Sequence, residues 1–180
     1  MHIFLGQQEI RGLCNGVAIF LPQVANPGDT VIILDNRTTA MTGHQPNPGV
    51  DMKELGFDGY NTISIESLVT SLGVQHVSTI KPFNLKKSTA LIKDALNFKG
   101  VSVVIAKEKC ILYAKSLKQA RGKAFRVTDK CKNHKNCINE LACPAFYIDD
   151  GRVKINESLC TGCSVCAQVC PEHAIAPVKG

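Results

Sequence analysis

The stretch CTGCSVCAQVCP, residues 160–171, decides how the C-terminal part of this chain folds. Its spacing is C-x2-C-x2-C-x3-C-P, in which the first three thiolates hold one cubane iron–sulfur cluster and the fourth holds the other cluster of a pair. The two-residue spacers turn the backbone around a cluster and let several amides point at its sulfides. Cys160, Cys163 and Cys166 are therefore expected to share one cluster, and Cys170 is expected to serve a second one.

A second cysteine stretch, DKCKNHKNCINELACPAF (129–146), repeats this unit with one change. Three cysteines cannot close a four-iron cube, and Cys143, which also precedes a proline, is the natural fourth donor of the cluster named B here. By the same symmetry, cluster A has a histidine, His134, at the position of a cysteine. The predicted ligands of cluster B are Cys143, Cys160, Cys163 and Cys166. The predicted ligands of cluster A are Cys131, His134, Cys137 and Cys170.

Three outcomes are open at cluster A. In the first, His134 ligates iron, because Cys131, His134 and Cys137 keep the spacing of the other loop and imidazole ligates iron in Rieske centres. In the second, His134 turns away and a [3Fe-4S] cluster forms on three cysteines. In the third, no cluster A forms. Ligation by His134 predicts a higher reduction potential for cluster A, because a neutral imidazole replaces a thiolate.

Other uses of the cysteines are weaker alternatives. The chain has nine cysteines, and seven of them fall between Cys131 and Cys170. A secreted disulfide scaffold does not fit, because the start MHIFLGQQEI has no basic segment followed by a long apolar one. A zinc site of three cysteines and one histidine leaves the paired Cys-Pro repeat unexplained. Cys14 and Cys110 lie outside the repeat and are expected to be buried, inert thiols.

The bulk composition favours a globular protein with no nucleic-acid or membrane partner. The chain has 180 residues, of which 44% are hydrophobic and 20% charged, and its net charge is +6. Lys and Arg are spread from Lys81 to Lys135 rather than forming one block, so nucleic-acid binding is not expected. No apolar run reaches about 18 residues, so no membrane span is expected. A cytoplasmic protein is predicted.

The segments before the cysteines alternate between strand-like and helix-like patterns. TVIILD (30–35) is an apolar run typical of a buried parallel strand, and Ser64 is a suitable N-cap for a helix. The alternation predicts an α/β domain with a parallel sheet and right-handed crossovers. The predicted strands cover residues 30–35, 76–80 and 101–106, and the predicted helices cover residues 64–74 and 85–98.

A basic segment, residues 107–126, is interpreted as a linker with a short helix or strand. After it, DDG (149–151) lies between two alternating runs and predicts a hairpin turn. We therefore divide the chain into an α/β domain, residues 1–120, and a two-cluster ferredoxin-like α+β domain, residues 121–180.

The loop after the first predicted strand, ILDNRTTAMTGHQPNPG (33–49), offers ligands for a hard cation and its phosphates. Asp35 and Asn36 supply oxygens, three threonines supply hydroxyls, and Gly43 allows close approach of the backbone. In open α/β sheets ligands bind beyond the carboxyl ends of strands. The alternative is a polar turn rich in Thr and Pro.

The segment LDNRTTAMTGHQPNPG (34–49) resembles the thiamine diphosphate and Mg²⁺ loop of indolepyruvate:ferredoxin oxidoreductase α subunits, which also end in a two-cluster domain. The resemblance implies that residues 1–120 are part of a thiamine diphosphate-binding parallel-sheet domain. It implies that Asn36 and the Thr38 carbonyl help to bind Mg²⁺. The other implied contacts, around the diphosphate and thiazolium, are Thr39, Ala40, Met41, Thr42, Gly43 and Gln45.

The resemblance also implies a reaction, the oxidative decarboxylation of an aryl 2-oxoacid to an acyl-coenzyme A, with electrons passed through the clusters. Implied partners are an external ferredoxin, a second (β) subunit, the 2-oxoacid and coenzyme A. This chain lacks the family's long N-terminal part and its earlier Gly-Asp motif, and Asp29 cannot replace that motif because it precedes the strand that Asn36 follows. Six extended residues span roughly 20 Å.

We therefore expect an oxidoreductase subunit that is a C-terminal fragment, a split subunit or a truncated reading frame, and is inactive alone. No catalytic side chain is predicted. The first rival is a free-standing ferredoxin-like electron carrier with an α/β docking module. The second is a truncated product with no activity.

Overall fold

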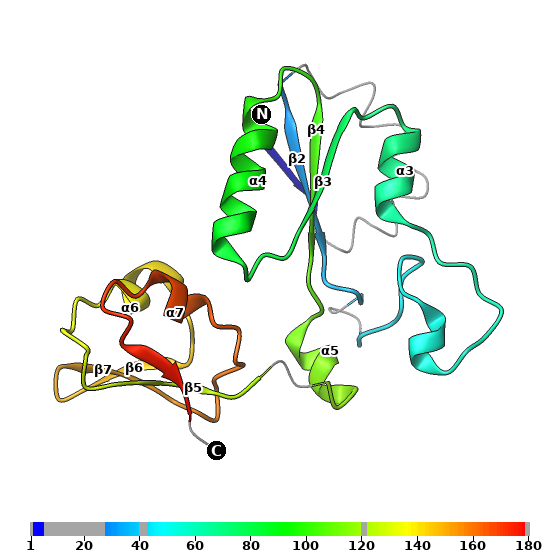
Figure 1. The fold of residues 1–180 in the computed structure, drawn as a ribbon. Helices are drawn as coiled ribbons and strands as arrows, with labels where there is room; N and C mark the ends of the chain where they lie inside the picture. The colour runs from blue at the N-terminus through cyan, green and yellow to red at the C-terminus, as the bar shows by residue number, and fades with distance from the viewer. Residues whose placement is uncertain (1, 6–27, 40–42, 120–121, 179–180) are drawn as a thin grey trace. The chain divides into compact units, whose positions relative to one another are not determined.

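The structure is a computed structural model that describes residues 2–5, 28–39, 43–119 and 122–178. The chain divides into two compact units, Met1–Tyr113 and Ala114–Gly180 (Figure 1). The domain boundary expected near residue 120 stays a prediction. Cys14 and three residues of the predicted thiamine loop, Ala40, Met41 and Thr42, lie outside the described residues.

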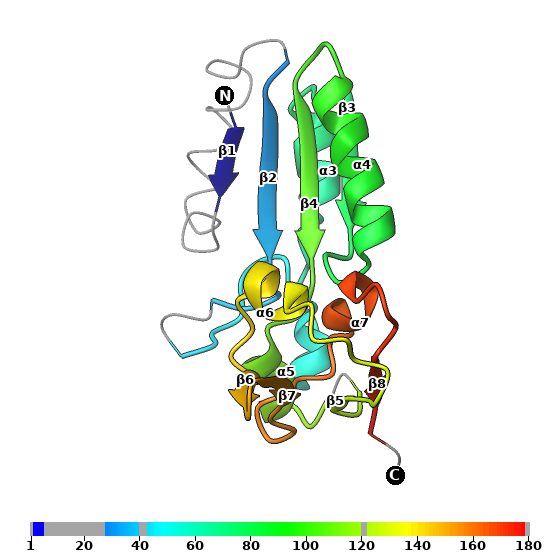
Figure 2. The ribbon, with the colours of Figure 1, turned by 90° about the vertical axis from the view of Figure 1, so that its left-hand side faces the viewer.

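The first unit is built on a four-stranded parallel sheet with the strand order β1-β2-β4-β3. Its strands are β1 (His2–Leu5), β2 (Thr30–Asp35), β3 (His76–Ile80) and β4 (Ser102–Lys107). Figure 2 shows β1, β2 and β4 running side by side in the same direction. The predicted α/β class and the three predicted strands are confirmed, whereas β1 was not predicted.

Two helices cover the sheet, one on each face (Figure 1). Helix α3 (Ile65–Ser71) begins as predicted, because the Ser64 hydroxyl accepts a hydrogen bond from the Ser67 N–H at 3.1 Å. Helix α4 (Leu85–Asn97) lies on the opposite face. The first unit also holds a short 3-10 helix, η3 (Met52–Leu55), and helix α5 (Ile111–Ser116) spans the boundary between the two units.

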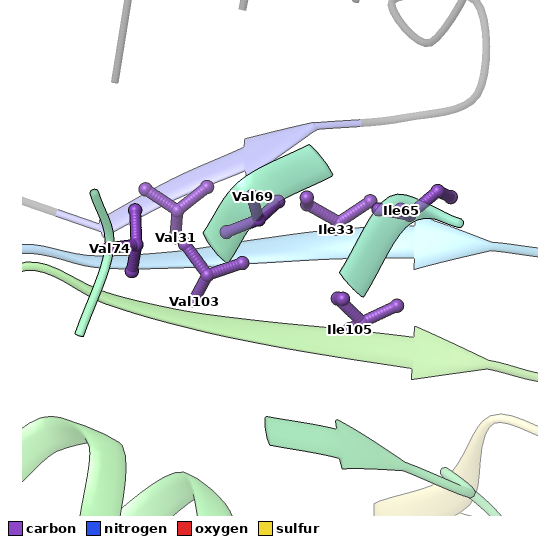
Figure 3. Close-up of a cluster of buried hydrophobic side chains, with 7 residues drawn as sticks. All are labelled: Val31, Ile33, Ile65, Val69, Val74, Val103 and Ile105. Atoms are coloured by element: carbon purple, nitrogen blue, oxygen red, sulfur yellow. The ribbon is translucent and has the colours of Figure 1, made fainter. Parts of the chain in front are cut away.

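The core of the first unit follows from the alternation of side chains along β2 and β4. Val31 and Ile33 point to the α3 face together with Val103 and Ile105, and all four are completely buried. Val104 and Ala106 point to the other face, against Ala95 of α4. The α3-side cluster in Figure 3 consists of Val31, Ile33, Ile65, Val69, Val74, Val103 and Ile105.

The second unit holds two small antiparallel sheets and two short helices. The element order is β5 (Phe125–Val127), α6 (Asn136–Leu141), β6 (Phe146–Asp149), β7 (Arg152–Ile155), α7 (Val165–Val169) and β8 (Ile175–Pro177). β6 pairs with β7 across the predicted turn, where Asp150 and Gly151 have φ angles of 47° and 71°. β5 pairs with β8, which was not predicted. None of the helices in the described segments is long and apolar enough to span a bilayer.

Candidate functional site

The two cysteine loops, residues 131–137 and 160–166, have the same backbone pattern. Asn133 and Lys135 of the first loop have φ angles of 60° and 65°. The matching residues of the second loop, Gly162 and Ser164, have φ angles of 71° and 62°. In each loop the second of these left-handed residues is the N-cap of a helix, α6 or α7. The internal repeat therefore extends from the sequence to the backbone, and His134 lies between two left-handed residues as Cys163 does.

The second loop brings together the four cysteines predicted for cluster B. Burial first, and then charge repulsion from Cys163, Cys160 and Cys143, raise the pKa of the Cys166 thiol to about 11. Cys143 comes from the end of the first cysteine stretch, so the fold delivers it to the other loop, as the repeat requires. A group of thiols that repel one another as anions is a site that a cationic iron centre would stabilise.

The first loop brings together the three cysteines predicted for cluster A. Burial raises the pKa of the Cys137 thiol, while hydrogen bonds from the backbone N–H groups of Ile138 and Cys137 lower it. Repulsion from Cys170 and Cys131 adds to the rise. Cys170, from the end of the second stretch, thus belongs to the first loop. Cys170 therefore lies near Cys137 and Cys131, where a shared cluster would need it.

Backbone amides point at the cysteine sulfurs. The N–H of Phe125 donates to Cys160 Sγ at 3.3 Å, and the N–H of Asn133 donates to Cys131 Sγ at 3.4 Å. A third N–H, from Ala174, donates to Cys170 Sγ at 3.3 Å. The seven cysteines of the repeat are half-buried and form no disulfide. Such donors stabilise thiolates and tune the potential of iron–sulfur centres, so the donor set fits a cluster.

The arrangement of the described residues does not suit a single metal ion. Among the residues that the structure describes, no three His, Cys, Asp or Glu side chains are placed to hold one metal ion. A cubane keeps its four thiolates apart by its own volume, so its ligands are spaced more widely than those of a single ion.

His134 contacts the carboxylate of Glu172, a residue that was not predicted from the sequence to be part of the site. Its Nε2 lies 3.0 Å from Glu172 Oε1, and Lys132 Nζ lies 3.0 Å from Glu172 Oε2. His134 also lines a small cavity together with Cys131 and Cys170. The hydrogen bonds from His134 and Lys132 lower the pKa of Glu172. A signal was present in the sequence, because Cys170-Pro is followed by Glu172 whereas Cys143-Pro is followed by an alanine.

The predicted thiamine loop begins at the carboxyl end of β2. Asp35 is buried, and its carboxylate accepts hydrogen bonds from Arg37, from the backbone N–H at 2.9 Å and from Nη1 at 3.0 Å. These contacts make a tight turn at the start of the loop. The contact with Arg37 was not predicted from the sequence. Asp29 precedes β2 and therefore lies at the opposite end of the strand from Asn36, as expected.

Further hydrogen bonds that involve backbone atoms hold the described part of the loop. Asn36 Oδ1 accepts from the Thr38 N–H at 3.1 Å, and Gln45 O accepts from the Thr39 N–H at 2.8 Å. Thr38 Oγ1 donates to the same Gln45 carbonyl at 3.3 Å. Thr39 Oγ1 is buried and has no hydrogen-bond partner in the described part of the chain. Gly43, with a φ of 102°, makes a turn that other residues resist.

A buried hydroxyl without a partner is costly, so Thr39 fits a loop that encloses a polar ligand such as a diphosphate. Beside it, the His44 ring stacks on Tyr113 with the ring centroids 5.9 Å apart. Cys110 donates its backbone N–H to the Asn36 carbonyl at 2.9 Å. Its thiol is half-buried, not buried as expected, because it lies just before helix α5.

Comparison with protein families gives two matches. Residues 26–106 match the family described as thiamine pyrophosphate enzyme, C-terminal TPP binding domain. Residues 153–176 match the 4Fe-4S binding domain. The first match contains the loop after β2, and the second contains the Cys160–Cys170 loop.

Several curated relatives are similar to this chain. It is 41% identical over 167 residues to the indolepyruvate oxidoreductase subunit IorA of Archaeoglobus fulgidus, covering 91% of this chain and 27% of that protein. It is 45% identical over 148 residues to IorA of Methanothermobacter marburgensis, covering 82% and 23%. It is also 43% identical over 53 residues to the pyruvate synthase subunit PorD of the latter organism, covering 29% and 62%. The chain thus spans about a quarter of the length of the IorA relatives.

Proposed function

We propose that this chain, which belongs to the family of indolepyruvate oxidoreductase IorA subunits, carries electrons through two [4Fe-4S] clusters in a 2-oxoacid:ferredoxin oxidoreductase. The observation that carries the proposal is the repeated backbone of the two cysteine loops, in which each half of the repeat delivers its last cysteine to the other half. This is the ligand exchange of paired clusters, and it occurs in a chain that also matches a thiamine pyrophosphate domain.

Cluster B would be held by the thiolates of Cys143, Cys160, Cys163 and Cys166. The N–H of Phe125 would stay on Cys160 Sγ and offset part of the thiolate charge. Cluster A would be held by Cys131, Cys137 and Cys170, with His134 as the fourth ligand. A neutral ligand makes cluster A less negative than cluster B and therefore easier to reduce.

The His134 ring is oriented by Glu172 in a way that supports ligation. Metal-binding histidines commonly donate their second ring N–H to a carboxylate, which fixes the ring and its tautomer. With Nε2 on Glu172 at 3.0 Å, Nδ1 is the nitrogen left for iron. In this role Glu172 is a positioning residue. A [3Fe-4S] cluster on three cysteines is the alternative, with His134 retained by Glu172 alone.

The loop after β2 would contribute to a thiamine diphosphate site, where Asn36 and the Thr38 carbonyl hold Mg²⁺. Thr39 Oγ1 would donate to the diphosphate and so gain a partner that it does not have among the described residues. Residues 40–42, Gly43 and Gln45 would surround the cofactor. When bound, thiamine diphosphate supplies the electron sink that a decarboxylation needs. The chain's own part is to bind, to orient and to exclude water.

The proposed partners follow from this role. They are an external ferredoxin, a second subunit of the oxidoreductase, the remainder of the thiamine-binding subunit, coenzyme A and a 2-oxoacid of the aryl pyruvate type. The proposed location is the cytoplasm.

Anaerobic reconstitution with iron and sulfide tests the proposal. The loaded chain should be brown and hold about eight irons, or about seven if cluster A has three irons. Stoichiometric zinc without charge-transfer absorbance would overturn it. A thiamine diphosphate titration with Mg²⁺, carried out with the remainder of the thiamine-binding subunit added, then separates the thiamine role from the rival, a free-standing ferredoxin-like carrier. Protection of the 34–49 segment in hydrogen exchange supports the thiamine role, and unchanged exchange supports the rival.

A further inference from the structure

We propose that a basic pocket beside Cys131 docks an acidic electron-carrier protein and that electrons leave the chain from cluster A. The inference rests on the function proposed above, because it presupposes that the clusters are bound.

The pocket has a volume of about 510 Å³ and is formed by the first cysteine loop and strand β7. Cys131, a proposed ligand of cluster A, is part of its wall. Three cationic side chains also line it, Lys132, Arg152 and Lys154, against one carboxylate, Asp129. A partner seated here would therefore meet positive charge next to a cluster ligand.

The cations on β7 lie in a row because of the alternation of the strand. Arg152 and Lys154 are exposed, whereas Val153 between them is 3% exposed and anchors the strand. Hydrogen bonds of Asn133 also connect this row to the cysteine loop. Asn133 Nδ2 donates to the Gly151 carbonyl at 2.7 Å, and Asn133 Oδ1 accepts from the Val153 N–H at 3.3 Å. The charges thus keep a fixed position relative to the loop.

Only one of the two cysteine loops carries such charge. Lys130, Lys132 and Lys135 surround Cys131 in sequence, whereas residues 160–170 contain no charged side chain. Complementary charge speeds the encounter of two proteins and selects the partner. An acidic carrier would therefore be drawn to cluster A in preference to cluster B.

The pocket's lysines remain available to a partner. Lys132 pairs with Glu172 and Lys154 pairs with Asp149, but both lysines are largely exposed to water. Exposed pairs of this kind are weak, so carboxylates of an incoming protein can compete for them.

The redox step is a single electron transfer without bond formation or proton movement. A reduced cluster held by Cys131, Cys137 and Cys170 would give up one electron, and its charge would become less negative by one. The oxidised carrier gains that electron and becomes more negative by one. Transfer falls steeply with distance, so the carrier must dock at the cluster's nearest exposed face.

The test uses the full chain with its clusters reconstituted. Binding of a fluorescently labelled acidic [2Fe-2S] ferredoxin to the oxidised chain gives Kd, and stopped-flow reduction of the same ferredoxin by the dithionite-reduced chain gives the rate constant. The variant is Arg152→Gln/Lys154→Gln, and the matched control is Lys86→Gln/Lys93→Gln, which removes the same charge from exposed positions on α4. Oxidation by methyl viologen checks the clusters.

At low ionic strength the pocket variant should raise Kd and lower the rate constant about tenfold. The control should change either value less than twofold, and methyl viologen should oxidise all forms equally. Equal losses in both variants would overturn the proposal, because net charge alone would then explain binding. Saturable inhibition by phosphate at constant ionic strength would also overturn it in favour of a small-anion site. Chains without reducible clusters would overturn the proposed function as well.

Discussion

The two cysteine loops of the second unit, residues 131–137 and 160–166, share a backbone but differ in chemistry. The first has left-handed residues at Asn133 and Lys135, and the second has them at the matching positions. Yet the first loop has three lysines within residues 130–135, and the second has none. A common fold therefore supports two electrostatic environments.

The loops also differ at two linked positions. His134 in the first loop matches Cys163 in the second, and Glu172, two residues after Cys170, matches Ala145, two residues after Cys143. His134 and Glu172 are in contact at 3.0 Å. The comparison teaches that the two loops differ at a pair of residues in contact with each other, and not at the histidine alone.

Removing the central ligand of each loop should give the largest effect. Cys163→Ser should abolish cluster B and lower the iron content by about four, because a weak donor replaces a thiolate. His134→Ser should keep at least a three-iron cluster A. Iron analysis and EPR measure both. Loss of about four irons in both variants would break the asymmetry and make His134 as necessary as the cysteine.

Replacing the proposed imidazole ligand by a thiolate should shift the reduction potential of one of the two clusters. His134→Cys adds a thiolate to cluster A and should lower its midpoint potential by on the order of 100 mV, judged from the Rieske contrast. Cluster B should remain almost unchanged. An EPR-monitored redox titration separates the two clusters. If neither potential moves, His134 is not a ligand.

Alanine substitutions at two matching positions of the loops, Gly162 and Asn133, should lower the free energy of unfolding for different reasons. A Cβ at Gly162 would lie 3.0 Å from the Gly122 carbonyl, at a φ of 71°, so Gly162→Ala should cost about 1–3 kcal/mol. Asn133→Ala removes the hydrogen bonds to Gly151 and Val153 and should cost about 1–2 kcal/mol. Thermal unfolding of the loaded chains measures both, and equal tolerance of alanine at Gly162 and at an exposed site would contradict the close approach.

The smallest effect is expected at the supporting carboxylate. Glu172→Gln keeps a hydrogen-bond acceptor for His134 but removes a negative charge near cluster A, which should raise its potential by about 30 mV through water. Glu172→Ala should add broadening of the cluster A EPR signal, because the ring loses its orientation. Glu157→Gln removes the same charge from an exposed position of the unit, serves as the control and should leave cluster A almost unchanged.

Local rules predicted much of this fold. The apolar run 30–35 became β2, Ser64 capped α3, and DDG formed the β6–β7 turn, because each depends on neighbours in sequence. The spacing of the cysteines also predicted which thiols gather around Cys137 and Cys166.

The remainder depends on partners distant in sequence or on side-chain orientation. β1 is a strand of four residues, too short for a pattern of its own, and it is defined by its pairing with β2. The contact of His134 with Glu172 spans 38 residues. Thr39 has the same side chain as Thr38, and only the structure shows that the Thr38 hydroxyl has a partner whereas the Thr39 hydroxyl has none among the described residues.

The pairing of β5 with β8 joins the two ends of the cysteine-rich unit, with Val127 opposite Ile175. The first and last strands of this unit therefore lie side by side in one small sheet. A segment with adjoining ends can be moved between hosts or re-ordered by circular permutation without stretching its interior. This topology suits a unit that evolution or an engineer could transfer to a different oxidoreductase.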